Sequence, residues 1–403
     1  MSLSFLESLT EQCVLAIVVD LKKYMNEKPN LIIYRNLLLP FSEGFIPNQA
    51  ESLTRFNPYY VGLRSSKGLQ LLSSKVISAS DAGWQGILTE ASAKLGFFPP
   101  SFTRRIRSVN PILIHAHFGP DGLTALPLAN LLNIPLVVTF HGHDATIKDQ
   151  YAKRINYTFR KYVQNREKLQ KSGKLFIAVS DFIRAKLIEQ GFPESKLVTH
   201  YIGIDVDLFS PDGSDEREPI VLFVGRLVEK KGCQYLIQAM SRVQAVLPNA
   251  ELVVIGDGVL KAELEKLADE QLKRYRFLGV QPPDQVRKWM GRAMVFSVPS
   301  ITSSNGDSEG LGLVFLEAQA MGTPVVSSRH GGIPEAVEHN LTGFLAGERS
   351  SDELAEFILN LFQNKLLWKE FSKNGQVRVR KMFNLKEQTL KLEELYGQVL
   401  VSR

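Results

Sequence analysis

Two glutamates, Glu309 and Glu317, lie eight positions apart at the start of an apolar segment. Glu309 is followed at once by Gly310-Leu311-Gly312, and glycine lets the backbone approach a bound group closely. The free N–H groups at the start of a helix attract anions, and carboxylates accept hydrogen bonds from hydroxyls. These residues therefore predict a site for a ligand that carries both phosphate and hydroxyl groups.

Apolar runs bounded by Gly and Pro predict the elements that position this pair. Residues 295–298 predict a buried strand, residues 313–321 a helix, and residues 325–326 the start of the next strand. In an open α/β sheet, ligands lie beyond the carboxyl ends of the strands. An unpaired carboxylate is costly inside an apolar segment, so we expect Glu317 to contact a ligand. The alternative is that both glutamates are solvated surface residues.

A second pattern of this kind begins the second half of the chain. The apolar run 220–224 ends at Gly225-Arg226, and Lys231 follows five positions later. A strand that ends in glycine and is followed by two spaced cations predicts a diphosphate site. The run 252–258 also ends in a glycine turn, but Lys261 stands where a dinucleotide fingerprint needs a third glycine.

The pattern Glu309-x7-Glu317 after a proline-ended strand closely resembles the family 4 retaining glycosyltransferases of the GT-B fold. The loop 300–310 is most similar to their bacterial exopolysaccharide branch, including the colanic-acid-type enzymes. The resemblance covers about residues 31–400 and implies an α/β fold in which two doubly wound, Rossmann-like parallel-sheet domains face a central cleft. The implied parts are an acceptor-binding domain at 1–210, a nucleotide-sugar-binding domain at 219–384, and a helix at 385–403 that packs back on the first domain.

The resemblance also implies an activity. The expected reaction is transfer of a hexose from a nucleoside-diphosphate sugar to a saccharide or lipid-linked saccharide in polysaccharide biosynthesis, with retained configuration. A UDP-sugar is the favoured donor and GDP-mannose the runner-up, and neither a metal nor another cofactor is expected. The alternatives are an epimerase or phosphorylase of the same fold, or a non-catalytic carbohydrate-binding protein.

Individual residues take roles from this resemblance. Glu309 would contact the sugar, Glu317 the ribose, and the backbone around Val280 the base. His141 would lie beside the donor sugar. The residues implied are His141 and Glu309 for catalysis; Gly225, Arg226, Lys231, Val280, Gly310, Leu311, Gly312 and Glu317 for the donor; and Glu43, His117 and Asp144 for the acceptor.

The first half of the chain supplies these acceptor residues. A predicted strand at 31–39 leads into a Ser-Glu-x-Phe-Ile pattern typical of the exopolysaccharide branch, which makes Glu43 a candidate acceptor contact. A carboxylate at a helix start is an equally simple interpretation of Glu43. A strand at 111–117 carries His115 and His117 on one side, and the strand 136–140 runs into His141-Gly142-His143-Asp144.

Metal binding is an alternative interpretation of two patterns. Closely spaced histidines can chelate zinc, but no cysteine or carboxylate set completes four ligands beside the histidines of 115–143. Asp205-x-Asp207 could be taken for the metal motif of the other major glycosyltransferase fold. Its context, 202–211, instead resembles the interdomain segment of family 4, and the polar run 212–219 predicts the linker.

Composition limits the class of protein. The chain has 403 residues, enough for two domains. It contains only two cysteines, Cys13 and Cys233, so no disulfide framework is expected. We therefore expect the protein in a reducing cytoplasm. The apolar run 14–19 is too short to span a bilayer, and the N-terminus does not resemble a signal peptide. Residues 1–30 resemble an amphipathic helix without an assignable role.

Charge is unevenly distributed along the chain. Lys and Arg outnumber Asp and Glu by 24 to 15 in residues 1–200, whereas in 201–403 the acids outnumber the bases by 27 to 24. Residues 151–174 contain eight basic residues against one acid, Glu167, with four interleaved aromatic residues. Such a segment is typical of peripheral contact with an anionic membrane, such as the inner face of the plasma membrane, although a solvated helix face is the simpler alternative. Nothing resembles a nucleic-acid-binding module.

Overall fold

The computed structural model describes residues 28–401 apart from 39, 66–72 and 212–215. Most of the predicted N-terminal amphipathic helix, Cys13 and part of the predicted linker lie outside these residues. The chain forms two compact units. One comprises the described parts of Met1–Ala116, Thr124–Leu136 and Glu393–Arg403, and the other comprises His117–Leu123 and Val137–Leu392.

The strands of the first half form a seven-stranded sheet in the order β3-β2-β1-β4-β5-β6-β7. The paired strands run parallel, as the sequence predicted. The order reverses between β1 and β4, where loops after neighbouring strands diverge and ligand sites commonly form. Its strands are β1 (Asn30–Leu38), β2 (Asn57–Ser65), β3 (Val76–Ser78), β4 (Pro111–His117), β5 (Leu136–Phe140), β6 (Leu175–Ala178) and β7 (Leu197–Thr199).

The strands of the second half form a six-stranded parallel sheet in the order β10-β9-β8-β11-β12-β13. Here the order reverses between β8 and β11, so the loops that leave these two strands lie at the switch point. The predicted diphosphate residues follow β8 and the predicted glutamate motif follows β11. The strands are β8 (Glu218–Val224), β9 (Glu251–Ile255), β10 (Tyr275–Phe277), β11 (Ala293–Phe296), β12 (Val325–Ser328) and β13 (Gly343–Ala346).

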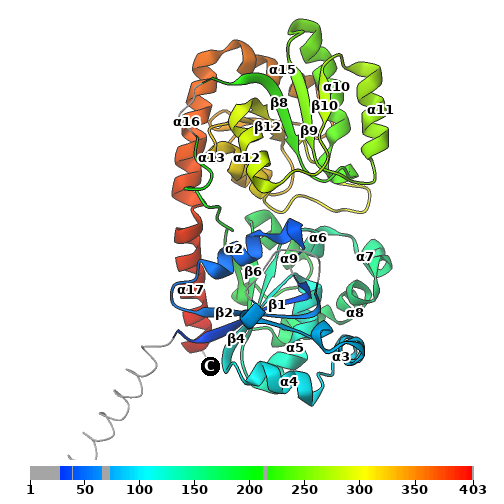
Figure 1. The fold of residues 1–403 in the computed structure, drawn as a ribbon, viewed down its shortest axis with the longest axis vertical. Helices are drawn as coiled ribbons and strands as arrows, with labels where there is room; N and C mark the ends of the chain where they lie inside the picture. Colours follow the sequence, from blue (N-terminus) through cyan, green and yellow to red (C-terminus); the bar gives the residue numbers. More distant parts are fainter. Residues whose placement is uncertain (1–27, 39, 66–72, 212–215, 402–403) are drawn as a thin grey trace, which may run out of the picture. The chain divides into compact units, whose positions relative to one another are not determined.

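Helices cover both faces of this second sheet. One face carries α10 (Cys233–Val246), α11 (Lys261–Gln271) and α15 (Ser351–Gln363), and the other carries α12 (Pro283–Arg292), α13 (Leu313–Ala320) and α16 (Lys365–Met382) (Figure 1). Strands that are buried on both faces read as continuous apolar runs, which is why β8, β9 and β11 were predictable from the sequence.

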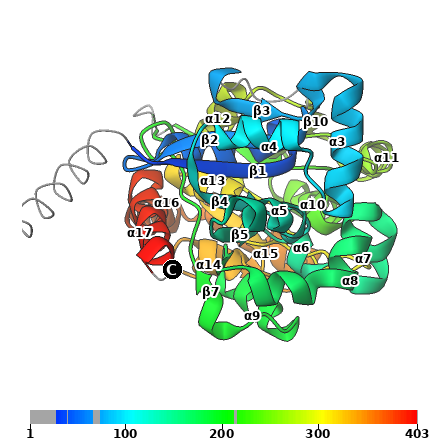
Figure 2. The same cartoon turned by 90° about the horizontal axis from the view of Figure 1, so that it is seen from below.

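The basic segment 151–174 falls mainly in two helices. Asn156 separates α7 (Asp149–Ile155) from α8 (Tyr157–Ser172), and its side chain accepts a 3.0 Å hydrogen bond from the N–H of Phe159. An asparagine in this position satisfies an amide at the start of a helix. The two helices lie side by side (Figures 1 and 2). No helix among the described residues is both long and apolar enough to cross a membrane.

The remaining helices follow strands of the first sheet, except for α14, which follows β12 of the second sheet, and α17, which closes the chain. They are α2 (Phe45–Glu51), α3 (Trp84–Leu95), α4 (Pro100–Arg107), α5 (Gly119–Leu132), α6 (His143–Thr146), α9 (Asp181–Glu189), α14 (Ile333–Ala336) and α17 (Leu385–Val401). In the middle of α17, Glu393 accepts hydrogen bonds from the N–H groups of Thr54 and Arg55. One turn further along the helix, the hydroxyl oxygen of Tyr396 lies 2.6 Å from Nδ1 of His115. The domain limits at residues 210, 219 and 384 stay a prediction.

Candidate active site

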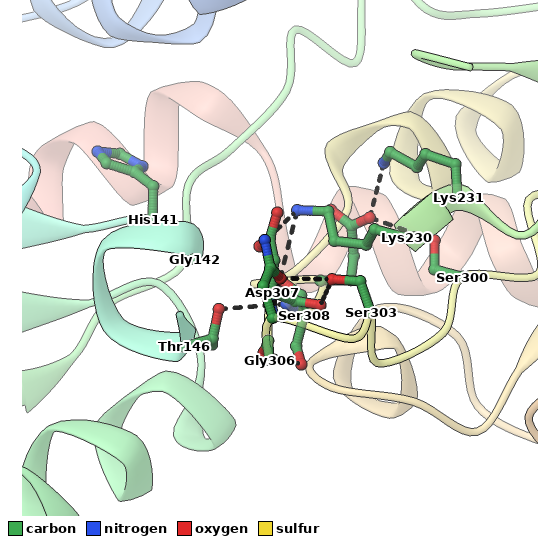
Figure 3. Close-up of polar contacts among 12 residues, drawn as sticks. His141, Gly142, Thr146, Lys230, Lys231, Ser300, Ser303, Gly306, Asp307 and Ser308 are labelled. Atoms are coloured by element: carbon green, nitrogen blue, oxygen red, sulfur yellow. Dashed lines mark hydrogen bonds and ion pairs between the residues drawn. The ribbon is translucent and has the colours of Figure 1, made fainter. Parts of the chain in front are cut away.

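An ion pair joins the two loops at the switch point of the second sheet. Nζ of Lys231, in the turn after β8, lies 2.6 Å from Oε2 of Glu309, in the loop after β11 (Figure 3). The hydroxyl of Ser300 donates to the same oxygen over 3.3 Å. Burial alone would raise the pKa of Glu309, but the nearby Lys231 and Lys230 outweigh burial and lower the pKa to about 2. Glu309 is therefore ionised at neutral pH.

The backbone of Glu309 is held by a histidine that the sequence did not single out. The N–H of Glu309 donates to Nε2 of His330 over 3.2 Å, so the proton of the neutral ring is on Nδ1, which faces Oε1 of Glu348 at 2.9 Å. His330 is buried. Its only sequence signal is its place before Gly331-Gly332, at the carboxyl end of β12, where site residues of parallel sheets concentrate.

The start of α13 presents a series of unsatisfied amides. Among the described residues, none of the backbone N–H groups from Gly310 to Val314 finds a hydrogen-bond acceptor. Gly312 has a φ of +83°, a conformation that favours glycine, and the helix begins directly after it. Free amides at a helix start form a site for a phosphate group or another anion.

Glu317 lies on α13, one to two turns beyond these amides. Burial raises the pKa of its carboxyl to about 7, and no described residue pairs with it. A half-buried carboxylate without a partner is unfavourable unless something supplies hydrogen-bond donors. The carboxylate is thus suited to accept hydrogen bonds from the hydroxyls of a ligand.

The other predicted donor residues differ in their exposure and in their hydrogen-bond partners. Arg226 is exposed, and its guanidinium has no partner among the described residues. Val280 is also exposed, and the N–H of Gly225 donates to the carbonyl of Ile255 in β9. Lys230 is buried in an ion pair with Asp307 at 3.0 Å, so both lysines of this turn are paired with carboxylates of the loop after β11.

Close backbone contacts explain Gly310 in a way the sequence did not suggest. A Cβ atom on Gly310 would lie 2.0 Å from the carbonyl oxygen of His141, and one on Gly332 would lie 1.9 Å from that of Gly310. The hydroxyl of Ser180 donates to the Gly310 carbonyl over 2.6 Å. Glycine is needed here because three segments of the protein meet, and the approach of a ligand to its backbone stays a prediction.

The loop before Glu309 is anchored in the same way (Figure 3). The N–H of Ser308 donates to the hydroxyl of Thr146 over 3.1 Å, and the N–H of Lys148 donates to the carbonyl of Asn305 over 3.0 Å. The hydroxyl of Ser303 donates to the carbonyl of Asp307. These bonds fix the loop that carries Glu309 against the segment that follows His141.

His117, His141 and Asp144 lie together in the structure. Nδ1 of His117 is 3.0 Å from Nε2 of His141, and the two rings stack. Asp144 is buried, and its carboxylate accepts hydrogen bonds from the N–H groups of Gly119, His141 and Gly142. Because both of its oxygens accept amides, Asp144 holds the backbone of the His141 turn.

Glu43 belongs to the other compact unit. Its two carboxylate oxygens form a bidentate pair with Arg35 at 2.9 and 2.7 Å. The other predicted site residues named above all belong to the second unit: His117, His141, Asp144, Arg226, Lys231, Glu309–Gly312 and Glu317. Contacts of Glu43, His117 and Asp144 with an acceptor stay predictions.

The described residues contain no group of three or more His, Cys, Asp and Glu side chains placed to hold a metal ion. Asp205 accepts hydrogen bonds from the N–H groups of Asp207 and Leu208, and Asp207 pairs with Lys386 at 2.8 Å. This arrangement is that of an aspartate-stabilised turn with a surface ion pair.

Comparison with known proteins connects this geometry to a family. Residues 207–378 match the model of the glycosyl transferases group 1 family, and residues 82–208 match the model of glycosyltransferase family 4. The amylovoran biosynthesis glycosyltransferase AmsK of Erwinia amylovora is 34% identical over 62% of this chain and 61% of its own. A putative colanic acid biosynthesis glycosyltransferase of Escherichia coli is 32% identical over 60% of this chain and 59% of its own. The match thus spans about three fifths of these two relatives.

Two further similarities cover more of the chain. An uncharacterized glycosyltransferase of Methanocaldococcus jannaschii is 30% identical over 71% of this chain and 75% of its own. The crystal structure of Anabaena HepE in complex with UDP and glucose matches with a TM-score of 0.72 at 20% identity, over 92% of this chain and 100% of that one. This structural match shows the GT-B fold. The chain belongs to the family 4, or group 1, glycosyltransferases.

Proposed function

We propose that the protein is a retaining hexosyltransferase that uses a nucleoside-diphosphate sugar and acts in polysaccharide biosynthesis. One observation carries the proposal: the free amides of Gly310–Val314 lie along the chain between Glu309, which pairs with Lys231, and the partnerless, half-buried carboxylate of Glu317. A diphosphate flanked by a sugar and a ribose satisfies all of these groups together. A ligand without the ribose would leave Glu317 unpaired, and a ligand without phosphates would leave the amides unpaired.

Donor binding rearranges the Lys231–Glu309 pair in this proposal. Lys231, together with Arg226, turns to the diphosphate, and Glu309 is released to accept hydrogen bonds from hydroxyls of the transferred sugar. Glu309 stays ionised because its pKa is lowered to about 2. His141 orients the donor sugar, with Asp144 holding its backbone and His117 its ring.

The chemistry assigned to these residues is stabilisation of charge in the transition state. As the bond between sugar and diphosphate breaks, negative charge grows on the leaving diphosphate and positive charge on the sugar. The negative charge on the diphosphate is stabilised by Arg226, Lys231 and the helix-start amides. The positive charge on the sugar is stabilised by the carboxylate of Glu309. We propose that these cations and amides make a divalent metal unnecessary. The acceptor hydroxyl then attacks from the face that the diphosphate leaves, with the phosphate accepting its proton, and the configuration is retained.

A UDP-sugar is the donor we favour, with GDP-mannose as the runner-up. The Anabaena relative in fold was crystallised with UDP and glucose, and the names of the bacterial relatives refer to amylovoran and colanic acid biosynthesis. A saccharide or lipid-linked saccharide is the acceptor class that accords with these names. The exposed cations of 151–174 and the excess of basic residues in 1–200 support action in the cytoplasm at an anionic membrane surface.

A panel of nucleotide-sugars tests the proposal in two steps. Thermal shift identifies the donor, because a ligand that binds only the folded state raises the melting temperature in proportion to affinity and concentration. Release of the nucleoside diphosphate from that donor is then measured with pooled saccharide and lipid-linked acceptors. Acceptor-dependent release supports the transferase. Release without acceptor, with a free epimer or a sugar phosphate as product, supports an epimerase or phosphorylase instead.

A further inference from the structure

The outer face of α3 is apolar and exposed. Its large side chains recur at the spacing of a single helical stripe, and each is between 59% and 75% exposed. We define the α3 stripe as Trp84, Ile87, Leu88 and Leu95. Soluble proteins rarely expose large apolar side chains together, so a contiguous set of this kind marks a surface that meets a partner or a membrane.

Packing on the opposite face of α3 fixes this orientation. Gly86, Thr89 and Ala93 are buried against the body of the unit. A Cβ atom on Gly86 would lie 2.3 Å from the carbonyl oxygen of Ala79, so a larger residue cannot take this position without moving the helix. The helix thus turns its small residues inward and its large apolar residues outward.

An apolar groove with a basic edge continues from the end of α3. It has a volume of about 470 Å³, and apolar side chains and two arginines, Arg104 and Arg107, line it. Its apolar lining includes Phe97, Phe98, Pro100, Pro127 and Leu131. Phe97 is 61% exposed, and α3 and α4 lie next to each other (Figures 1 and 2).

The charge around these apolar groups is positive. Residues 84–107 contain four cations against one carboxylate, Glu90, which already pairs with Arg64 and Lys94. Arg104 is exposed and has no partner among the described residues. Arg105 pairs with Asp81, and Arg107 donates to the carbonyl of Leu131, so Arg104 and Arg107 are the two arginines that no described carboxylate neutralises. An apolar stripe beside two such arginines is complementary to a surface that offers acyl chains and phosphates together.

We propose that the α3 stripe and the arginines of α4 dock onto an anionic lipid surface. The four apolar side chains enter the boundary between headgroups and acyl chains, and Arg104 and Arg107 bind lipid phosphates beside the groove. This inference rests on the membrane association proposed above and uses none of the active-site residues. It assigns that association to α3 and α4, since in the basic segment Tyr162 is buried and Arg166 pairs with Asp149.

Vesicle binding measured on surface variants tests this assignment. The α3 variant Trp84→Gln/Ile87→Gln/Leu88→Gln should bind vesicles of phosphatidylglycerol and phosphatidylcholine about 100-fold more weakly than the parent protein. The reason is that it lacks three apolar side chains that the membrane would bury. Arg104→Glu/Arg107→Glu should weaken binding to these anionic vesicles by about 10-fold or more, and added salt should reduce the difference. The blue shift of tryptophan fluorescence on vesicle binding should disappear in Trp84→Phe, while Trp289 and Trp368 remain.

Two controls separate this surface from the others. Val246→Gln/Leu366→Gln/Val377→Gln removes exposed apolar side chains elsewhere and should bind vesicles like the parent protein. Arg160→Glu/Lys161→Glu/Lys168→Glu, on α8, should lose less affinity than the α4 variant. The thermal shift produced by UDP, measured on every variant, shows whether the donor site is intact independently of vesicle binding.

Several outcomes would overturn the inference. In one, the α8 variant releases the protein from vesicles while the α3 variant binds like the parent, which assigns the contact to α7 and α8. In another, the parent protein does not bind anionic vesicles and only the α3 variant changes its oligomeric state, which makes the α3 stripe an interface between copies. A third is vesicle binding that appears only when residues 1–27 are deleted, which makes that segment the occupant of the stripe.

Discussion

Nζ of Lys231 lies 2.6 Å from Oε2 of Glu309, so the cation assigned to the diphosphate and the carboxylate assigned to the sugar hold each other. Both side chains are largely buried, at 13% and 12% exposure. In the proposed function a donor separates them, and each partner then gains a new contact with the donor. The pair would thereby link recognition of the diphosphate to recognition of the sugar.

The first prediction follows from this pair. Glu309→Gln should lower kcat by about 30- to 1000-fold, because a contact that strengthens in the transition state is worth about 2–4 kcal/mol. UDP should bind this variant at least as tightly as the parent protein, since Lys231 is no longer held by a carboxylate. Glu317→Ala should instead weaken the binding of UDP itself. Calorimetry with UDP and single-turnover transfer measure both effects.

The opposite pattern would reverse the two assignments. Loss of UDP binding in Glu309→Gln with unchanged binding in Glu317→Ala would place Glu309 at the ribose. Parental transfer rates in both variants would show that the active site lies elsewhere. Glu356→Ala, at an exposed position of α15, is a control for loss of a carboxylate in the same unit.

The second prediction concerns protons. Burial raises the pKa of Glu317 to about 7, so the group is partly protonated near neutral pH. Hydroxyl donors favour the carboxylate, so UDP binding at pH 6.5 should release about half a proton or more. Calorimetry in buffers of different ionisation enthalpy measures this release. It should vanish in Glu317→Gln, and an unchanged release in that variant would contradict the assignment.

The two glutamates have opposite effects on stability. The lowered pKa of Glu309 stabilises the fold above its ordinary value of 4.5, and this contribution is lost as pH falls toward about 2. The raised pKa of Glu317 gives stability at low pH that is lost as pH rises from about 4.5 through about 7. Glu317→Gln should therefore raise the melting temperature of the ligand-free protein more at pH 8 than at pH 5. Equal increases at both pH values would argue against a desolvated carboxylate.

The third prediction tests the backbone contact at Gly310. Gly310→Ala places a methyl group 2.0 Å from the carbonyl oxygen of His141 and should cost about 1–3 kcal/mol of stability or displace the loop. Gly397→Ala is the matched control, because nothing lies within 4 Å of its Cβ position on α17 and alanine favours a helix. Urea unfolding and transfer assays compare the two. Equal stability and activity in both variants would contradict the contact.

The fourth prediction is independence from divalent metals. In the proposed function, two cations and the free amides at the start of α13 supply the positive charge that a metal would otherwise supply. Transfer should therefore persist in excess EDTA. If EDTA abolished transfer and magnesium or manganese restored it, this expectation would be wrong. Asp205 and Asp207 would then be candidate metal ligands again.

The sequence predicted the elements of the fold well where burial dictates residue type. Strands covered on both faces must be apolar throughout, so β5 and β8 appeared as continuous runs of apolar residues. The helix after Gly312 was predictable from the apolar segment that follows two glycines. The break at Asn156 was missed, although an asparagine is a common residue at the start of a helix.

Contacts between distant segments were beyond the sequence. His330 is 21 residues from the Glu309 N–H that donates to it, and Ser180 is 130 residues from the Gly310 carbonyl that it holds. Glu335 accepts hydrogen bonds from Asp181 and Phe182 at the start of α9, another long-range contact. The hydrophobic periodicity of the sequence cannot predict such pairs, because each pair depends on how loops from separate strands meet. The motif predicted the position of the site, and the structure shows how the predicted residues are held.

Single-turnover transfer from a UDP-hexose tests the central claim most directly. The rate of transfer to pooled saccharide and lipid-linked acceptors is compared between the parent protein and Arg226→Ala/Lys231→Ala. The anomeric configuration of the product is determined as well. The account predicts acceptor-dependent transfer with retained configuration in the parent and a rate lower by about 100-fold or more in the variant. Transfer at the parental rate without both cations, or a product of inverted configuration, would contradict it.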